Sequence, residues 1–252
     1  MGSESEFAGR IVLVTGSSSG IGERIAERFA ELGATVVVNS ASSVAAGEEV
    51  AARLHDRYGT PAIYLRADIS DADQARGLVA DTVDRYGGLD VLVNNAGWTT
   101  RLDHRDLDAL TDDIFRRTFD VNVWGTWALT KAAIPHLRES ADGNVVTITS
   151  VAGLRPIGSS IAYAMSKAAL NHMTVLLAKS YGPVRFNAVA PGLVETPWTA
   201  DWDDMHAGTA AVTPLGRSAT PDDCAEAVLA LVRNRYTTGE VFVVDGGITL
   251  VM

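Results

Sequence analysis

Two side chains that could do acid–base chemistry, Tyr163 and Lys167, stand four positions apart in the segment Tyr-Ala-Met-Ser-Lys. On a helix this spacing places both side chains on one face, a turn apart. An ammonium group beside a phenol stabilises the phenolate, so it would lower the tyrosine pKa from its usual value of about 10. Such a phenol can donate or accept a proton at a substrate oxygen. The same spacing is common in surface pairs, so this pair alone does not identify a site.

A glycine-rich segment near the N-terminus has the flanks of a nucleotide-binding loop. Residues 10–15 form an apolar run typical of a strand buried on both faces, and Gly16, Gly20 and Gly22 follow it. Apolar residues then recur at helical spacing over residues 21–32. Glycines let a backbone approach a pyrophosphate, which the free N–H groups of the helix start can bind. The spacing differs from the more widespread Gly-x-Gly-x-x-Gly, and a tight glycine turn is the alternative interpretation.

Strand and helix patterns alternate along the rest of the chain. Apolar runs predict further strands at residues 34–38, 63–66, 89–93, 145–149, 185–189 and 241–244. Helical spacing predicts helices at residues 44–58, 72–86, 114–137 (with a bend near Gly125) and 221–233, and a helix that carries Tyr163 and ends near Tyr181. This alternation predicts an α/β fold, with one doubly wound sheet of about seven parallel strands and helices on both faces. No linker or repeat interrupts it, so we expect a single domain over residues 1–252.

The polar and glycine-rich motifs follow the ends of these predicted strands. They are residues 16–22, Asp68, residues 94–97, Ser150 and residues 191–192. In a parallel sheet the carboxyl ends of the strands share one edge, and ligands bind there. The motifs should therefore meet in space, and this convergence favours a functional role for the tyrosine and lysine that follow Ser150.

Taken together, these motifs resemble those of the short-chain dehydrogenase/reductase family, in its short, single-domain branch. They stand here as Thr15-Gly-Ser-Ser-Ser-Gly-Ile-Gly22, Asp68-Ile69, Asn94-Asn-Ala-Gly97, Asn122, Ser150, Tyr163-x-x-x-Lys167 and Pro191-Gly-Leu-Val-Glu-Thr196. The resemblance covers the chain from about Ala8 to Gly247 and is specific as a set. It implies a Rossmann-type fold and an NAD(P)-dependent oxidoreductase that interconverts a carbonyl and a secondary alcohol by hydride transfer.

The resemblance also implies a role for each matching residue. Tyr163 would be the general acid in reduction and the general base in oxidation, and Ser150 would hydrogen-bond the substrate oxygen. Lys167 would hold the nicotinamide ribose and lower the tyrosine pKa, and Asn122 would anchor a water in a proton relay. Cofactor contacts are implied, besides Tyr163 and Lys167, for Gly16, Ser18, Ser19, Gly20, Ile21, Gly22, Asn39, Ser40, Asp68, Ile69, Asn95, Ala96, Gly97, Pro191, Gly192, Val194 and Thr196.

The identity of the nicotinamide cofactor depends on the end of the second strand. NAD enzymes usually place Asp or Glu there to bind the ribose 2′-OH. Here the segment reads Asn39-Ser40-Ala-Ser-Ser, which has no acid and suits a 2′-phosphate better. An arginine in the glycine loop would support NADP further, but Ser19 fills that position, and the loop after the strand has no Arg or Lys. The sequence therefore favours NADP over NAD without deciding between them.

Aromatic residues surround the expected substrate side. Trp98 follows the Asn-Asn-Ala-Gly motif, and Trp198, Trp202 and Met205 lie in a segment, residues 193–216, that caps the substrate pocket in the family. We expect a hydrophobic or aromatic carbonyl substrate, although these side chains could instead pack the lid or a subunit contact. A 3-oxoacyl-carrier-protein reductase is an alternative, with Arg101, Arg105, Arg155 and Arg217 as candidate docking residues.

A function of another class is also compatible with the fold. A nucleotide-sensing regulator could keep the fold and lose the chemistry. All four residues implied in catalysis are present, and they favour an enzyme. In the family the helices carrying Trp124 and Tyr163 pair with a second subunit, so we expect a homodimer or homotetramer.

Composition sets the remaining expectations. The chain has 252 residues and a net charge of −10, which disfavours nucleic acid or an anionic membrane as a partner. Its one cysteine, Cys224, fits a reducing compartment, and the acidic residues 1–6 show no signal-peptide pattern, so we expect a cytoplasmic protein. The five histidines lack metal-ligand spacing, and no metal is expected. They are His55, His104, His136, His172 and His206.

Overall fold

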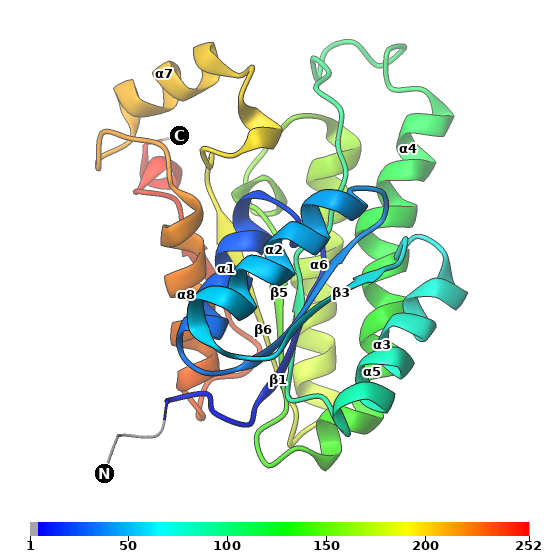
Figure 1. Ribbon diagram of the computed structural model, residues 1–252. Coiled ribbons are helices and arrows are strands. Elements are labelled where there is room, and N and C mark those ends of the chain that lie inside the picture. The colour runs from blue at the N-terminus through cyan, green and yellow to red at the C-terminus, as the bar shows by residue number, and fades with distance from the viewer. Residues whose placement is uncertain (1–4, 252) are drawn as a thin grey trace.

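A seven-stranded parallel sheet forms the centre of the protein, in the order β3-β2-β1-β4-β5-β6-β7 (Figure 1). The computed structural model describes residues 5–251, so residues 1–4 of the acidic N-terminal segment lie outside the described residues. The strands are β1 (Ile11–Val14), β2 (Thr35–Ser40), β3 (Ala62–Arg66), β4 (Val91–Asn94), β5 (Asn144–Ile148), β6 (Arg185–Pro191) and β7 (Val241–Val244). The predicted α/β fold class is confirmed.

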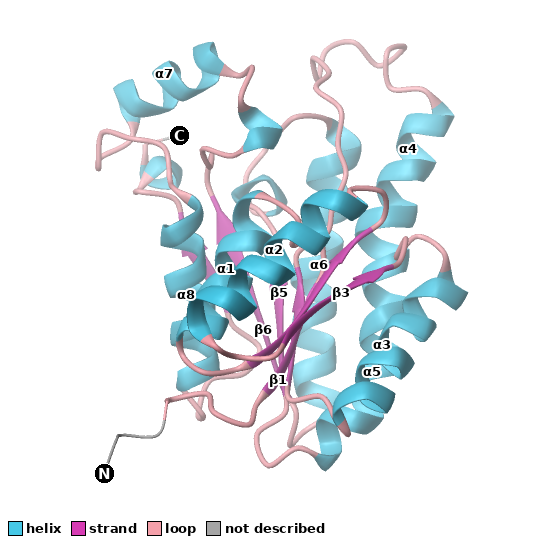
Figure 2. Cartoon of the chain, viewed as in Figure 1, coloured by secondary structure: helices cyan, strands magenta, loops and turns pink. Residues whose placement is uncertain are grey.

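Helices cover both faces of the sheet (Figure 2). The regular helices are α1 (Gly20–Glu31), α2 (Val44–Tyr58), α3 (Ala72–Tyr86), α4 (Asp112–Phe119), α5 (Thr126–Glu139), α6 (Ile161–Ser180), α7 (Asp203–Val212) and α8 (Pro221–Arg233). Side chains alternate along each strand, so β1 sends Val12 and Val14 into a core with α1, α2 and α8. Leu13 packs on the opposite face, in a second core with α3 and α5. Within residues 5–251, no helix has the length and apolar character needed to cross a membrane.

The strand order reverses between β1 and β4, which are neighbours although β2 and β3 separate them in sequence. Crossovers on the two sides of this point run to opposite faces of the sheet and leave a crevice at the carboxyl ends of the strands. Those ends lie at the top of Figure 1, where α7 and the loop before α4 rise above the sheet. The fold therefore places the motifs that follow β1, β3, β4, β5 and β6 around one opening.

The long helix predicted over residues 114–137 is interrupted. The structure has α4, then a π-helical segment η1 (Asp120–Gly125), and then α5. Close packing accompanies the break, because a Cβ on Gly125 would lie 2.5 Å from the carbonyl oxygen of Ile69. Such wide turns inside helices occur often at functional sites, and this one contains Asn122.

Candidate active site

A cavity of about 1070 Å³ spans the carboxyl ends of the strands and collects nearly all the residues predicted from the sequence. Among them it is lined by Gly16, Ser18, Ser19, Gly20, Ile21, Asn39, Ser40, Asp68, Ile69, Asn95, Ala96, Gly97, Trp98, Ser150, Tyr163, Lys167, Pro191, Gly192, Val194, Thr196, Trp198 and Trp202. Two predicted residues, Gly22 and Asn122, are buried behind the wall rather than on it. The convergence expected from the strand ends is thus present in the structure.

The glycine loop after β1 has the shape needed to approach a pyrophosphate. Gly16 and Gly20 have φ values of +61° and +59°, a region that favours glycine. A Cβ on Gly16 would lie 2.8 Å from the Cα of Ala96, so the loop after β4 packs directly against this turn. Glycines therefore leave the backbone free of side chains where α1 begins, and the residues present fit the pyrophosphate of a dinucleotide there.

Asn95 stabilises the glycine loop through hydrogen bonds. Its Nδ2 donates to the carbonyl oxygens of Thr15 and Gly16, at 2.9 and 3.0 Å. The Thr15 hydroxyl in turn accepts from the backbone N–H groups of Asn95 and Ala96. A side chain on Gly22 would collide with Asn95 Nδ2, so Gly22 acts through close packing. The Asn95 amide therefore holds two loops together.

The far end of the cavity lies against β2 and β3. Asn39 is buried, and its Nδ2 donates to the carbonyl oxygens of Leu65 and Ala67. The Ser40 hydroxyl lies 2.9 Å from the Tyr64 hydroxyl. Asp68 also lines the cavity, and its Oδ1 accepts from the backbone and hydroxyl of Ser70. This end is polar, and no carboxylate follows β2 directly.

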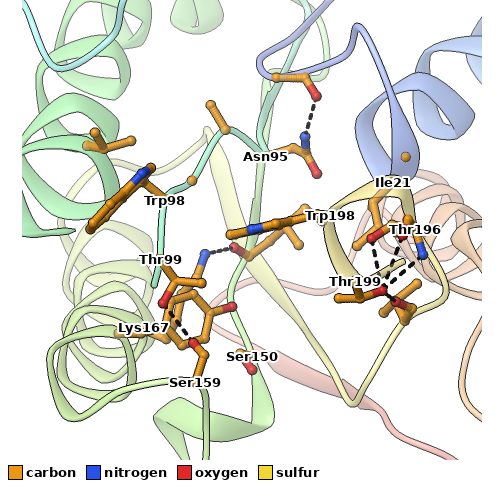
Figure 3. A pocket seen from close by; sticks show the side chains of 18 of the residues that line it. Ile21, Asn95, Trp98, Thr99, Ser150, Ser159, Lys167, Thr196, Trp198 and Thr199 are labelled. Atoms are coloured by element: carbon orange, nitrogen blue, oxygen red, sulfur yellow. Dashed lines mark hydrogen bonds between the residues drawn. The ribbon is translucent and has the colours of Figure 1, made fainter. Parts of the chain in front are cut away.

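Helix α6 positions Tyr163 and Lys167. Ser160 caps it, because its hydroxyl accepts from the backbone N–H of Tyr163. Lys167 is 4% exposed, and its Nζ lies 5.6 Å from the centre of the Tyr163 ring. The same Nζ donates to the carbonyl oxygen of Ile148, at 2.8 Å (Figure 3). Ser150 follows β5 and lines the cavity with both residues.

Burial shifts both groups toward their neutral forms. It raises the pKa of the Tyr163 phenol to about 12, although the interaction with the Ser150 hydroxyl acts in the opposite direction. It lowers the pKa of the Lys167 ammonium to about 8. The expected lowering of the tyrosine pKa by the lysine is therefore wrong for the structure described here. The reason is that desolvation dominates and the ammonium is directed at a backbone carbonyl.

Asn122 holds the segment after β4. Its Oδ1 accepts from the backbone N–H of Trp98 at 2.7 Å, and its Nδ2 donates to the Trp98 carbonyl and to the Ser166 hydroxyl. A Cβ on Gly97 would lie 3.4 Å from Asn122 Oδ1 and 3.7 Å from Lys167 Nζ. The asparagine thus joins η1, α6 and the loop that carries Trp98.

The other end of the cavity is largely apolar. Trp98, Trp198, Trp202 and Met205 line it, and the guanidinium of Arg117 lies 4.5 Å from the centre of the Trp98 ring. Three of these residues come from the predicted lid, which the structure folds into a 3₁₀ turn (Pro197–Thr199) and α7. Sequence periodicity gave no sign of α7, because α7 buries no residue.

His206 joins this lid segment to the chain behind it. Its Nδ1 lies 2.8 Å from the Ser218 hydroxyl, and its Nε2 lies 3.2 Å from the Thr199 hydroxyl. Within residues 5–251, no group of three or more His, Cys, Asp or Glu residues is arranged to hold a metal ion. The absence of a metal stays a prediction.

Several lining residues were missed from the sequence. Thr99 and Ser159 have hydroxyl groups 2.7 Å apart, near Lys167 and Ser150 (Figure 3). Arg116 and Arg117 line the opening from α4, and Ile248 reaches it from beyond β7. These residues follow no motif. Ser160, which caps α6 but does not line the cavity, did carry a signal, since a serine directly before a helix is a typical N-cap.

Comparisons with known proteins place this geometry in context. The family model for enoyl-(acyl carrier protein) reductase matches residues 16–249. A Streptomyces violaceoruber protein, whose name provisionally assigns it as ketoacyl reductase 2 of the granaticin polyketide synthase, is 54% identical over 94% of this chain and 95% of its own. The 3-oxoacyl-[acyl-carrier-protein] reductase of Thermotoga maritima is 34% identical over 97% of this chain and 98% of its own.

Solved structures have the same architecture. A short-chain type dehydrogenase/reductase from Mycobacterium marinum superimposes with a TM-score of 0.90, at 32% sequence identity and over 98% of both chains. The agreement therefore extends over nearly the whole fold and is not confined to one motif.

Proposed function

Because the chain belongs to the short-chain dehydrogenase/reductase family and is an NAD(P)-dependent oxidoreductase of the carbonyl/alcohol class, we propose that it is an NADPH-dependent ketoreductase for bulky, largely apolar ketones. The observation that carries this proposal is one cavity that is lined by the carboxylate-free segment after β2 and also by three tryptophans. Tyr163, Lys167 and Ser150 lie between these ends.

The catalytic roles follow from the positions of the side chains. A bound nicotinamide supplies the hydride for reduction. Negative charge then develops on the carbonyl oxygen, where the Ser150 hydroxyl donates a hydrogen bond and the Tyr163 hydroxyl donates a proton. Lys167 would hold the nicotinamide ribose, and in alcohol oxidation the same proton moves back to the phenolate.

Asn122 and the glycine loop act by positioning. Asn122 accepts a hydrogen bond from the Trp98 backbone nitrogen and donates one to the Trp98 carbonyl oxygen. It thereby fixes this backbone near Lys167. Gly16, Gly20 and the start of α1 would hold the pyrophosphate. Asp68 and Ile69 would contact the adenine, and residues 191–196 the nicotinamide carboxamide.

The choice of NADPH depends on the chemistry of the strand end. A carboxylate at this position would accept from a ribose 2′-OH and repel a 2′-phosphate, and Ser40 stands there instead. Kinetic constants for NADPH and NADH with one ketone provide the test. We expect a lower KM for NADPH, and a lower KM for NADH would contradict the proposal.

The substrate class follows from the lid. The surfaces of Trp98, Trp198 and Trp202 suit a ring-containing or long acyl ketone, and they offer few partners to a sugar hydroxyl. A panel of bicyclic ketones, small acyclic ketones and aldoses, followed by nicotinamide absorbance, tests this. We expect the highest kcat/KM for the bicyclic ketones, and a preference for aldoses would contradict it.

A second candidate is the reduction of a ketone carried by an acyl carrier protein. Arg117 lines the cavity beside Trp98, and Arg116, which pairs with Asp112, lines it too; there they could meet the phosphate of a carrier arm. Arg217, predicted as a docking residue, is instead paired with Asp223. A higher kcat/KM for a carrier-bound ketone than for the free thioester would favour this candidate.

We also propose that the chain forms one domain with residues 193–216 as a lid, and that it works in the cytoplasm as a homodimer or homotetramer. The lone cysteine, which is buried, supports a reducing compartment. Exposed apolar side chains on η1 and α6 support self-association.

A further inference from the structure

One arginine lies beside the end of the cavity that β2 and β3 form, although it belongs to no cofactor motif. Arg66 is the last residue of β3 and the register partner of Ser40, the last residue of β2. Its Nε donates to the carbonyl oxygen of Ala41 at 3.1 Å. Ala41 and Ser42 line the cavity, so this hydrogen bond brings the Arg66 guanidinium against the loop that forms this wall.

The terminal nitrogens of Arg66 remain available to a ligand. Over residues 5–251, no carboxylate lies within ion-pair distance of this side chain, although most arginines of the chain are paired with acids. Its Nε contact leaves Nη1 and Nη2 free to form the two parallel N–H bonds that a phosphate accepts. The side chain is therefore anchored at one nitrogen and open at the others.

The surroundings of Arg66 also suit an anion. Ser40 and Ser42 present hydroxyl groups at the cavity wall. The first turn of α2, which starts beside them, contains no acidic residue. In a chain with a net charge of −10, a cation and hydroxyl groups meet here, and the residues directly after β2 include no carboxylate.

We propose that Arg66 selects the phosphorylated nicotinamide cofactor by pairing with the 2′-phosphate on its adenosine ribose. This inference rests on the proposed use of NADPH. It supplies the cation that neither the glycine loop nor residues 41–43 provide. The cation comes from the neighbouring strand, which sequence adjacency does not reveal.

Binding of cofactor fragments tests the inference without a substrate. Calorimetric titration of the full chain with adenosine 2′,5′-bisphosphate and with 5′-AMP isolates the contribution of the 2′-phosphate. For Arg66→Gln we expect roughly 10- to 100-fold weaker binding of the bisphosphate, the usual range for a lost charged hydrogen-bond pair, and unchanged binding of 5′-AMP. Arg66→Lys keeps the charge but lacks the paired guanidinium N–H groups. Its affinity for the bisphosphate should lie between those of the unmodified chain and of Arg66→Gln.

Arg85→Gln is the matched control. Arg85 lies in the last turn of α3, near the start of β3 and away from its carboxyl end, and its removal changes the net charge equally. It should leave both titrations unchanged. Thermal unfolding of each variant shows whether the fold is intact.

Two outcomes would overturn the inference in distinguishable ways. If the unmodified chain prefers the bisphosphate and Arg66→Gln keeps that preference, Arg66 is not the selecting residue and NADPH use stands. If the unmodified chain binds both ligands equally, the use of NADPH and the role of Arg66 fail together.

Discussion

At the scale of single residues, burial sets the acid–base behaviour of the catalytic pair. Tyr163 keeps its proton up to a pKa of about 12, so it is a proton donor across the physiological range. Lys167, with a pKa near 8, is the group that changes charge close to neutral pH. The lysine, and not the tyrosine, is therefore expected to govern the pH dependence of reduction.

Removal of the Tyr163 hydroxyl should abolish most of the activity. Tyr163→Phe keeps the ring but cannot donate a proton, so we expect kcat for ketone reduction to fall by about 10²-fold or more. Nicotinamide absorbance measures the rate, and cofactor titration checks that binding is retained. Tyr181→Phe, at the end of α6, is the control and should keep full activity. Near-normal turnover of Tyr163→Phe would contradict the assignment of Tyr163 as the proton donor.

The pH profile should report Lys167. Its ammonium is present below a pKa of about 8 and lost above it, so kcat/KM for reduction should fall as pH rises through about 8. The physical reason is that an ammonium forms stronger hydrogen bonds to the hydroxyl groups of the nicotinamide ribose than a neutral amine does. Profiles of kcat/KM report groups of the free enzyme, and a series from about pH 6 to pH 10 would define the step.

Lys167→Arg separates this explanation from others. The guanidinium stays charged throughout that range, so the variant should lack the step near pH 8 even if its overall rate is lower. An unchanged step in this variant would assign the titration to another group.

Residue types and spacings predicted which residues form the site better than they predicted the contacts of those residues. Tyr163, Lys167 and Ser150 follow from motif and strand order. The bond from Lys167 to the Ile148 carbonyl does not, because it depends on how α6 lies against β5. Arg66 was missed for the same reason, since its partner Ala41 is 25 residues away, directly after the neighbouring strand β2.

At the scale of elements, the glycine positions show which local geometry is required. α1 can begin next to β4 because Gly16 and Gly22 leave room for the Ala96 backbone and the Asn95 amide. This strand–loop–helix unit was predicted from the sequence. A bend of the long helix near Gly125 was also predicted, but its π-helical form at η1 was not, because Gly125 packs there against Ile69, a residue of a distant segment.

Gly22→Ala should damage cofactor binding. The added methyl would collide with Asn95 Nδ2 and the Gly16 carbonyl, so the loop has to move. We expect at least about a tenfold loss of NADPH affinity, comparable to about 1.4 kcal/mol, measured by tryptophan fluorescence.

Gly77→Ala is the matched control for that variant. It lies within α3, and a Cβ there meets no atom within 4 Å. Because alanine is the better helix former, this change should leave cofactor affinity intact and stabilise the fold by about 0.5–1 kcal/mol in denaturant unfolding. Equal affinity losses in the two variants would show that the glycine loop is not the cause.

At the scale of the whole molecule, the parallel sheet explains why motifs far apart in sequence form one site. Strand order places the ends of β1, β4, β5 and β6 side by side, with the lid segment after β6 above them. Alternation of strands and helices predicted this edge. It did not predict the shape of the lid, because α7 buries no residue and leaves no periodic apolar signal.

The outer surface also carries apolar groups that a lone chain does not explain. Trp124 on η1 is 51% exposed, and Met165, Val175 and Leu176 are exposed on α6, which packs against η1. Exposed large apolar side chains gathered on neighbouring elements mark interaction surfaces. A second copy of the chain is the expected partner, since the same face then supplies both sides of a symmetric contact.

Light scattering after gel filtration tests this surface. The unmodified chain should elute as a dimer or tetramer, and Leu176→Glu should shift it to a smaller species, because burying a carboxylate costs more than burying leucine contributes, about 1.5–3 kcal/mol. Leu107→Glu, a change at a leucine that is 68% exposed in the loop before α4, should leave the mass unchanged. A monomeric unmodified chain, or equal dissociation of both variants, would contradict an interface on α6.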